Sequence, residues 1–240
     1  MAAIKVSIRN NREEILDKWV PKTQLGKEVK SGKVTSISEI IKRGGRILEP
    51  EIIDALLPNL EVDLLEVGQS KGKFGGGKSS IWRQTQKVTR EGNRMTFSTC
   101  AVIGNKDGYV GIGYGSAKET VPAREKAIRN AKLNLIMIVR GSGSWEDVTD
   151  EPHSIPFLTE GKCGSSRIRL MPAPRGTGLT CQKQCKKILE MAGIKDVYSK
   201  TFGQTTKLNL VKACVDALKN LSNMKLAKGI NVVEGSVSEK

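Results

Sequence analysis

Histidine and aromatic residues are scarce in this 240-residue chain. His153 is the one histidine, and Phe, Trp and Tyr together supply 4% of the residues. With a single histidine the chain is poorly supplied for acid/base catalysis and for a metal site built from Cys and His. His153 follows Pro152, with another proline shortly after it, so we expect it to serve a turn or to pack. The few aromatics also indicate that stacking on unpaired bases is minor.

Acidic residues are outnumbered as well. The chain has 25 Asp and Glu against 40 Lys and Arg, which gives a formal net charge of +15. Such a charge attracts a polyanion, and nucleic acid is the usual one. A membrane surface would instead call for a basic amphipathic helix with Trp, Phe and Leu on its other side, or for a lipid signal. Neither is present, so no membrane partner is expected.

Long apolar runs are missing too. The longest, Leu135 to Val139, is far too short to cross a bilayer, and the N-terminus has no apolar segment typical of a secretory signal. The five cysteines are odd in number and scattered, which predicts reduced thiols in the cytoplasm. Cys181 and Cys185 are spaced i, i+4, but zinc needs two further ligands. We therefore expect buried, inert thiols, with no metal and no cofactor.

By composition the chain divides into five segments. A glycine- and lysine-rich stretch separates a region of short helical patterns from two regions with regular apolar patterning, and a polar tail follows. The predicted segments are a helical N-terminal arm (1–67), a basic Gly-rich loop (68–80), a β-β-β-α domain (81–140), a C-terminal α+β domain (141–222) and a flexible tail (223–240).

The β-β-β-α assignment depends on hydrophobic periodicity. Residues 81–89, 94–103 and 109–114 are rich in strand-forming residues and are separated by Gly- and Asn-containing hairpin turns. A helical period follows over residues 122–138, with an apolar stripe on one side and basic residues on the other. This order predicts a domain with a polar, basic outer face.

A second alternation of elements follows. Residues 166–170 and 196–202 are typical of strands, whereas 181–192 and 206–221 have helical periodicity. Gly193 closes the first of these helices. The β-α-β-α order predicts a compact α+β or split βαβ unit, so the fold class of the whole chain is α+β.

Residues 72–79 match the P-loop pattern G-x-x-x-x-G-K-S. In a P-loop, Lys78 would hold the β- and γ-phosphates of a nucleotide and Ser79 would bind magnesium. That chemistry needs a helix immediately after the loop, but residues 80–89 are rich in β-branched residues and predict a strand. We therefore expect these lysines to contact phosphates of a nucleic-acid backbone. A P-loop phosphotransferase is the enzymatic alternative.

The segment Gly111 to Gly115 has the spacing G-x-G-x-G, which differs from the G-x-G-x-x-G of dinucleotide-binding loops. We interpret its small residues as letting the chain leave the sheet. This would place Lys118 near a helix N-terminus, where free N–H groups favour an anion such as an RNA phosphate.

Two long blocks contain basic residues but no Asp or Glu, one between Glu66 and Glu91 and the other from Gly161 to Leu189. Contact with a polyanion explains such blocks better than ordinary solvated charge does. Arg175 lies on a loop made rigid by Pro and Gly, where it can touch RNA or a partner protein. The candidate RNA-binding residues are Lys71, Lys73, Lys78, Arg83, Lys87, Arg90, Arg94, Lys118, Arg129, Lys132, Arg167, Arg169 and Lys183.

Three long motifs resemble a known family. Residues 111–123, 169–179 and 189–197 resemble signatures of the small-subunit ribosomal protein numbered five in bacteria, and the similarity extends over roughly residues 81–221. The arm that carries Glu51 to Asp54 is similar to the archaeal and eukaryotic branch of this family. The resemblance implies a first domain of the double-stranded-RNA-binding type and a second domain of a left-handed β-α-β kind.

The resemblance also implies a function. It predicts a non-enzymatic constituent of the small ribosomal subunit in the cytoplasm, which binds ribosomal RNA and takes no small-molecule substrate. The hairpin of residues 88–97, carried by Arg90 and Arg94, would reach toward the decoding region, near the place where messenger RNA enters. The loop with Pro172, Arg175, Gly176, Thr177 and Gly178 would contact the fourth small-subunit protein, and the eighth is a further suspected neighbour.

Translational accuracy is the consequence that the resemblance implies. A free-standing regulator that binds double-stranded RNA remains the alternative. It would bind short duplexes alone and would not sediment with ribosomes.

Overall fold

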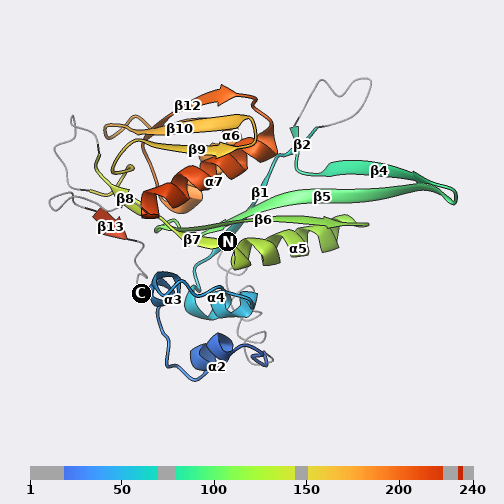
Figure 1. Cartoon of the computed structure of the whole chain (residues 1–240), viewed down its shortest axis with the longest axis horizontal. Coiled ribbons are helices and arrows are strands. Elements are labelled where there is room, and N and C mark those ends of the chain that lie inside the picture. The colour runs from blue at the N-terminus through green and yellow to red at the C-terminus, as the bar shows by residue number, and fades with distance from the viewer. Residues whose placement is uncertain (1–18, 70–78, 144–150, 224–231, 235–240) are drawn as a thin grey trace, which may run out of the picture. The chain divides into compact units, whose positions relative to one another are not determined.

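The computed structural model describes residues 19–69, 79–143, 151–223 and 232–234 (Figure 1). The chain forms two compact units, residues 1–60 and 61–240. Among its described residues, the first unit contains three short helices, α2 (Gln24–Lys30), α3 (Ile37–Lys42) and α4 (Pro50–Leu56). Helices of this length are marginal in isolation, so the packing of their buried isoleucines stabilises them. These isoleucines are Ile37, Ile40, Ile52 and Ile53.

Glu49 forms hydrogen bonds with the segment that precedes α2. Its carboxylate accepts hydrogen bonds from Trp19 Nε1 at 2.8 Å, from the Lys22 N–H at 2.9 Å and from the Thr23 N–H at 2.6 Å. Desolvation acts to raise the pKa of Glu49, but the hydrogen bonds together outweigh it and hold the pKa below its usual range. One carboxylate thus fixes the chain just before α2.

The second unit begins with an antiparallel five-stranded sheet. β5 is its longest strand and pairs along one edge with β6 and along the other with both β1 and β4, while β7 extends the sheet beyond β6. The three strands predicted between residues 81 and 114 are confirmed as β4, β5 and β6. The strands are β1 (Glu61–Leu65), β4 (Arg83–Thr89), β5 (Gly92–Gly104), β6 (Tyr109–Ala117) and β7 (Leu135–Met137).

Because β1 belongs to this sheet, the sheet begins at Glu61, whereas the sequence placed residues up to 67 in the helical arm. The helix predicted over residues 122–138 is observed as α5 (Thr120–Leu133), which ends five residues earlier. Asn134 leaves the helical conformation, and the apolar residues after it pair with β6 as β7. Periodicity alone could not separate this buried strand from the end of a helix.

The G-x-G-x-G segment of residues 111–115 lies within β6 and forms the packing surface for α5. A Cβ on Gly113 would lie 2.1 Å from the carbonyl oxygen of Ala127, so only glycine permits this approach of helix and strand. The flanking glycines meet the neighbouring turns of the helix in the same way. Interpreting these residues as the point where the chain leaves the sheet was therefore wrong, because β6 continues to Ala117. The alanines that face the three glycines are Ala123, Ala127 and Ala131.

A second sheet of four strands follows, in the order β11-β12-β10-β9. Its strands are β9 (Thr159–Cys163), β10 (Ser166–Pro172), β11 (Leu179–Thr180) and β12 (Val197–Gly203), and its helices are α6 (Lys183–Ala192) and α7 (Lys207–Asn223). The predicted strand-helix-strand-helix order is confirmed, although β9 was not expected. Two small ladders join β2 (Gly68–Gln69) to β3 (Ser79–Ser80) and β8 (Val139–Gly141) to β13 (Val232–Glu234).

Helices α6 and α7 lie between the two sheets (Figure 1). α6 contacts β5 and β6, whereas α7 contacts β9 and β10. Val102 and Val110 of the first sheet share one hydrophobic core with Ile188 and Leu189 of α6. The two regions that the sequence separated at residue 140 therefore pack as one body. None of the described helices is long and apolar enough to span a membrane.

Candidate nucleic-acid interface

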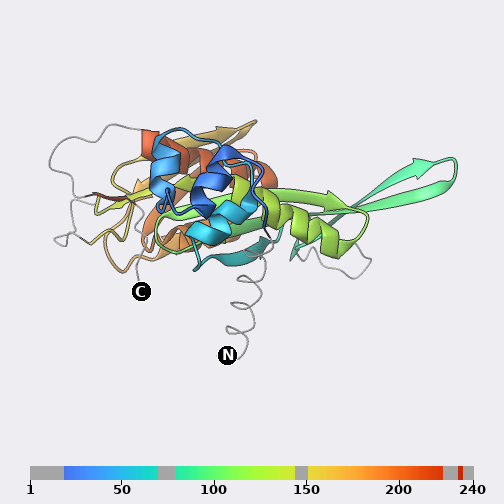
Figure 2. The same ribbon diagram turned by 90° about the horizontal axis from the view of Figure 1, so that it is seen from below.

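The first candidate surface is the hairpin of β4 and β5, which extends beyond β6 and α5 (Figures 1 and 2). A two-residue loop, Arg90–Glu91, joins the strands, and Gly92 takes a φ of +115°, a conformation that L side chains rarely adopt. Thr85 and Thr96 form a cross-strand hydrogen bond of 2.6 Å. Residues 83–88 and 91–95 are exposed on both faces, so this part of the ribbon lacks a core of its own. Two-stranded ribbons are marginally stable alone, which favours docking on a partner.

The register divides the charge of this hairpin between its faces. Lys87 lies directly opposite Arg94, so their side chains share one face, which also carries Arg83. Directly opposed like charges are unfavourable unless an anion lies against them. Glu91 accepts from Arg94 Nη2 at 2.6 Å and is the one acidic residue between positions 83 and 98. Arg90, at the exposed loop, adds a fourth cation to the hairpin.

The remaining candidate cations that the structure describes lie on or just before α5, on β10 and on α6. Lys118 precedes α5 and Arg129 lies on it, both exposed, and Lys132 is partly buried. Arg167 and Arg169 lie on β10, on the face of the second sheet that the helices leave uncovered. Lys71, Lys73 and Lys78 lie outside the described residues. The structure therefore does not gather the predicted RNA-binding residues into one patch.

Lys183, on α6, has an acidic partner within the fold, as Arg94 and Arg169 do. Its Nζ lies 2.9 Å from both carboxylate oxygens of Glu66. The hydrogen bond from Lys183 lowers the pKa of Glu66, against a smaller effect of desolvation. Nearby, Lys187 Nζ lies 2.8 Å from Asp63 Oδ2. These lysines hold α6 to the segment around β1, a role that the acid-free block in the sequence did not suggest.

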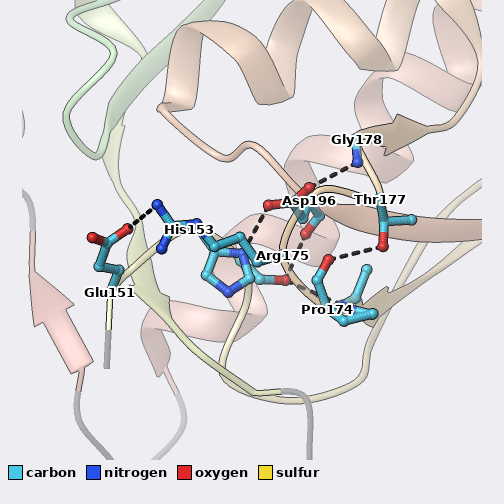
Figure 3. A network of polar contacts seen from close by, with 9 residues as sticks. Glu151, His153, Pro174, Arg175, Thr177, Gly178 and Asp196 are labelled. Atoms are coloured by element: carbon cyan, nitrogen blue, oxygen red, sulfur yellow. Dashed lines mark hydrogen bonds and ion pairs between the residues drawn. The ribbon is translucent and has the colours of Figure 1, made fainter. Parts of the chain in front are cut away.

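The second candidate surface is the loop between β10 and β11 (Figure 3). Gly176 and Gly178 take φ values of +87° and +73°, and Thr177 Oγ1 donates to the Pro174 carbonyl at 2.8 Å. Asp196, which is buried, accepts from the Gly178 N–H at 2.7 Å. Ser154 Oγ donates to the Asp196 carbonyl at 2.6 Å and closes the base of the loop. These hydrogen bonds restrain the loop.

Arg175 stands at the exposed tip of this loop. Its Nη2 lies 3.2 Å from Glu151 Oε2, and both side chains are more than half exposed. Such a pair contributes little to stability because water screens it. The guanidinium is therefore exposed to solvent, and its contact with RNA or a partner protein stays a prediction.

His153 has a structural role, as its position between prolines suggested. The side chain is 3% exposed, and its Nδ1 donates to Asp196 Oδ2 at 2.9 Å. An adjacent cleft of about 990 Å³ is lined by His153, four basic residues and two glutamates, with no Ser, Thr or Cys among its lining residues. Its described lining therefore offers no hydroxyl or thiol for the histidine to activate. Asp196 and Ser154 were missed in the sequence, where an isolated Asp and Ser give no signal.

The cysteines agree with the expectation of inert thiols. Burial raises the pKa of both Cys100 and Cys181 to about 12, so their thiols stay neutral. A hydrogen bond between the Cys214 and Cys185 side chains that favours the protonated Cys214 thiol, together with burial, raises the pKa of Cys214. Within the described ranges, no group of His, Cys, Asp or Glu is arranged to hold a metal ion.

The P-loop match also lacks its structural context. Residues 72–78 lie outside the described ranges, but the chain continues directly into β3 and then into β4. A strand therefore stands where a nucleotide-binding loop requires a helix. The expectation from the β-branched residues after Ser79 is confirmed.

Comparisons with known proteins match this fold. The description "Ribosomal protein S5, N-terminal domain" fits residues 81–139, and "Ribosomal protein S5, C-terminal domain" fits residues 161–229. The small ribosomal subunit protein uS5 of Nanoarchaeum equitans is 48% identical over 230 residues, which cover 94% of this chain and 99% of the relative. The uS5 proteins of Staphylothermus marinus (49% over 209 residues, 87% of this chain and 91% of the relative) and Methanocaldococcus jannaschii (44% over 227 residues, 92% and 98%) are similar over most of their lengths. The chain therefore belongs to the ribosomal protein S5 family, in the archaeal branch that these relatives represent.

Proposed function

We propose that this chain is a structural constituent of the small ribosomal subunit, where it binds ribosomal RNA and supports accurate decoding. The relatives that it matches almost end to end carry the name small ribosomal subunit protein uS5. The family is non-enzymatic, in agreement with the predicted lack of catalysis. The local structure is consistent with this, because His153 is locked to Asp196 and a strand follows the P-loop-like segment.

The β4–β5 hairpin carries the RNA-binding part of the proposal. It is an exposed ribbon with four cations and one carboxylate, and Lys87 directly opposes Arg94 on one face. Phosphates placed against this face would relieve the repulsion between the two cations. Docking would also give the ribbon the packing partner that it lacks within the chain. The resemblance to the family supports the decoding region as the place where this hairpin binds.

The salt dependence of RNA binding tests the hairpin. Replacing Lys87 and Arg94 by Gln removes two phosphate contacts, so the slope of log affinity against log salt should fall by roughly two. A matched control, Arg43→Gln with Lys219→Gln, removes the same charge from exposed sites on α7 and beside α3. We expect the control to keep nearly the full slope. Equal slopes for the hairpin variant and the control would contradict contact through this hairpin.

Sedimentation of the tagged chain through a sucrose gradient separates the ribosomal constituent from the alternatives. A constituent sediments with the small subunit, whereas a free-standing regulator that binds double-stranded RNA stays near the top of the gradient and binds short duplexes alone. A phosphotransferase would show magnesium-dependent turnover that is lost in Lys78→Ala. The mixed α+β fold is compatible with a first domain of the double-stranded-RNA-binding type, which remains a proposal.

The loop of residues 172–178 is proposed as a contact with a neighbouring protein. Its glycines permit close approach of another chain, and Arg175 presents a cation at its exposed tip. The resemblance supports the fourth small-subunit protein as this neighbour, with the eighth as a further partner of the chain. Accuracy of decoding would then depend on how firmly this contact holds.

A further inference from the structure

The face of the second sheet that turns away from α6 and α7 is open, and its composition is unusual for this chain. The antiparallel register places Arg167 opposite Phe202, Arg169 opposite Lys200 and Met171 opposite Tyr198. Residues directly opposite in an antiparallel pair lie on the same face, so all six side chains share it. The alternate residues of β10, such as Ile168 and Leu170, are buried against the helices. We call the exposed side the outer face.

The outer face carries two exposed aromatic rings. Tyr198 is 39% exposed and Phe202 is 38% exposed. They lie four residues apart on β12, which places them on the same side and about 13 Å apart along the strand. Rings at this exposure leave part of their surface open to solvent. Aromatic residues make up 4% of the chain, and two of them are exposed on this one face.

Cations surround these rings. The guanidinium carbon of Arg169 lies 5.4 Å from the centroid of the Phe202 ring, and Lys200 Nζ lies 5.6 Å from it. Glu160 accepts from Arg169 Nε at 2.5 Å and holds the guanidinium in place. A hollow of about 380 Å³ at the end of the strands is lined by Lys162, Arg167 and Phe202 together with small residues. On the described strands β9, β10 and β12, the outer face thus carries four cations and one carboxylate.

We propose that the outer face binds single-stranded RNA. Unpaired bases would stack on Tyr198 and Phe202, and the backbone phosphates would lie along Lys162, Arg167 and Lys200. Aromatic rings interleaved with cations suit this ligand because every base has a flat π surface and every nucleotide carries a negative charge. An apolar protein partner suits the face poorly, because docking would bury several charges without partners. The site is distinct from the hairpin of the proposed function and does not depend on it.

Binding of the full-length chain to a fluorescently labelled, unstructured RNA oligonucleotide tests the site by fluorescence anisotropy. Replacing Tyr198 and Phe202 by Leu keeps apolar side chains but removes the rings. The dissociation constant should rise by roughly tenfold for each ring. Tyr114→Leu is the matched control, because Tyr114 is an equally exposed aromatic (41%) on the first sheet. Tyr198→Phe should bind like the unaltered chain, since it keeps the ring.

An abasic strand of the same length separates stacking from charge. The unaltered chain should bind it more weakly than RNA, and the double Leu variant should bind both strands alike. Equal binding of RNA by the double Leu variant and the unaltered chain would overturn the proposal. If the Lys87 and Arg94 variant loses the salt dependence assigned to the hairpin but still binds the oligonucleotide, the outer-face site is supported and does not need the hairpin. If the double Leu variant loses oligonucleotide binding but keeps that salt dependence, the hairpin contact is likewise independent of the outer face. The two sites can therefore fail independently.

Cross-linking gives a readout that needs no variant. An oligonucleotide with 4-thiouridine should attach, after irradiation, to the peptide that contains Val197–Gly203. Cross-links confined to the hairpin or to α5 would place the single strand elsewhere and refute the outer-face site. A thermal melt of the double Leu variant is expected to match that of the unaltered chain, because both rings are exposed.

Discussion

The Nδ1 atom of His153 lies 2.9 Å from Oδ2 of Asp196, and both side chains are buried. The other carboxylate oxygen of Asp196 accepts from the Gly178 N–H at 2.7 Å. One buried carboxylate therefore joins the segment before β9, the beginning of β12 and the loop of residues 172–178. It restrains a loop that contains two left-handed glycines.

Replacing Asp196 by Ala should destabilise the chain by about 2–4 kcal/mol, because His153 Nδ1 and the Gly178 N–H would lose their partner inside the protein. Urea unfolding measures this free energy. Asp216→Ala is the control, since Asp216 accepts one backbone N–H, that of Lys162, at an exposed site. The control should cost less than ~1 kcal/mol. Similar losses in the two variants would show that the buried network adds no more stability than a surface contact.

Arg175→Glu should leave stability within about 0.5 kcal/mol of the unaltered chain, because the side chain is exposed. It should nevertheless change stop-codon readthrough in cells if the loop contacts a neighbouring ribosomal protein. The charge swap Arg175→Glu with Glu151→Arg restores the internal ion pair but not the outward charge. It should therefore behave like Arg175→Glu. Normal readthrough with normal subunit incorporation would remove the accuracy role, and a collapsed melt would make Arg175 a structural residue.

The sequence predicted most of the fold because strand and helix periods alternate clearly after residue 81. It failed where two signals look alike. Leu135–Met137 continues the apolar pattern of α5, yet it is a buried strand, and β9 contains Gly and Lys in place of a strand-forming run. The G-x-G-x-G segment was recognised, but its purpose, close contact with α5, depends on a packing distance that spacing does not encode.

The candidate site, like the fold, could be predicted from the sequence only in part. The acid-free blocks show where cations gather along the chain, but they could not show that Lys183 is paired with Glu66, which lies 117 residues away. The scarcity of aromatics suggested that base stacking is minor. It could not show that Arg167 and Arg169 of β10 lie on the same open face as Tyr198 and Phe202, because this depends on strand register. Composition gives the number of residues of each type, whereas a binding site depends on which of them the fold brings together.

Gly113→Ala should strongly destabilise the second unit. The added Cβ would lie 2.1 Å from both the Ala127 carbonyl oxygen and the Ala131 nitrogen, which belong to the helix backbone and cannot move aside cheaply. Overpacking of this kind costs about 1–3 kcal/mol or more, and a thermal melt should show a clear fall in Tm. Tyr114→Ala on the same strand is the control, because its side chain is exposed and points away from α5. A Gly113→Ala melt equal to that of the control would mean that α5 does not pack against β6 as described.

Acid should loosen the first unit through Glu49. Its pKa is lowered in the folded chain because hydrogen bonds from Thr23, Trp19 and Lys22 outweigh the effect of desolvation. A lowered pKa contributes stability that is present above the pKa of the unfolded chain, near 4.3, and is lost as the pH falls through the lower folded value. Fluorescence of Trp19, measured between pH 6 and pH 2 after the other two tryptophans are changed to Phe, follows this transition.

Glu49→Gln removes the titrating carboxylate, so the fluorescence change assigned to it should disappear. The variant should also be less stable at pH 7, because the amide accepts the Trp19 and Thr23 hydrogen bonds less strongly than a carboxylate does. Glu51→Gln carries the same change of charge two residues away and should keep the transition. An acid transition of Trp19 that persists in Glu49→Gln would show that another group controls this segment, because no second carboxylate among the described residues accepts the Trp19 hydrogen bond.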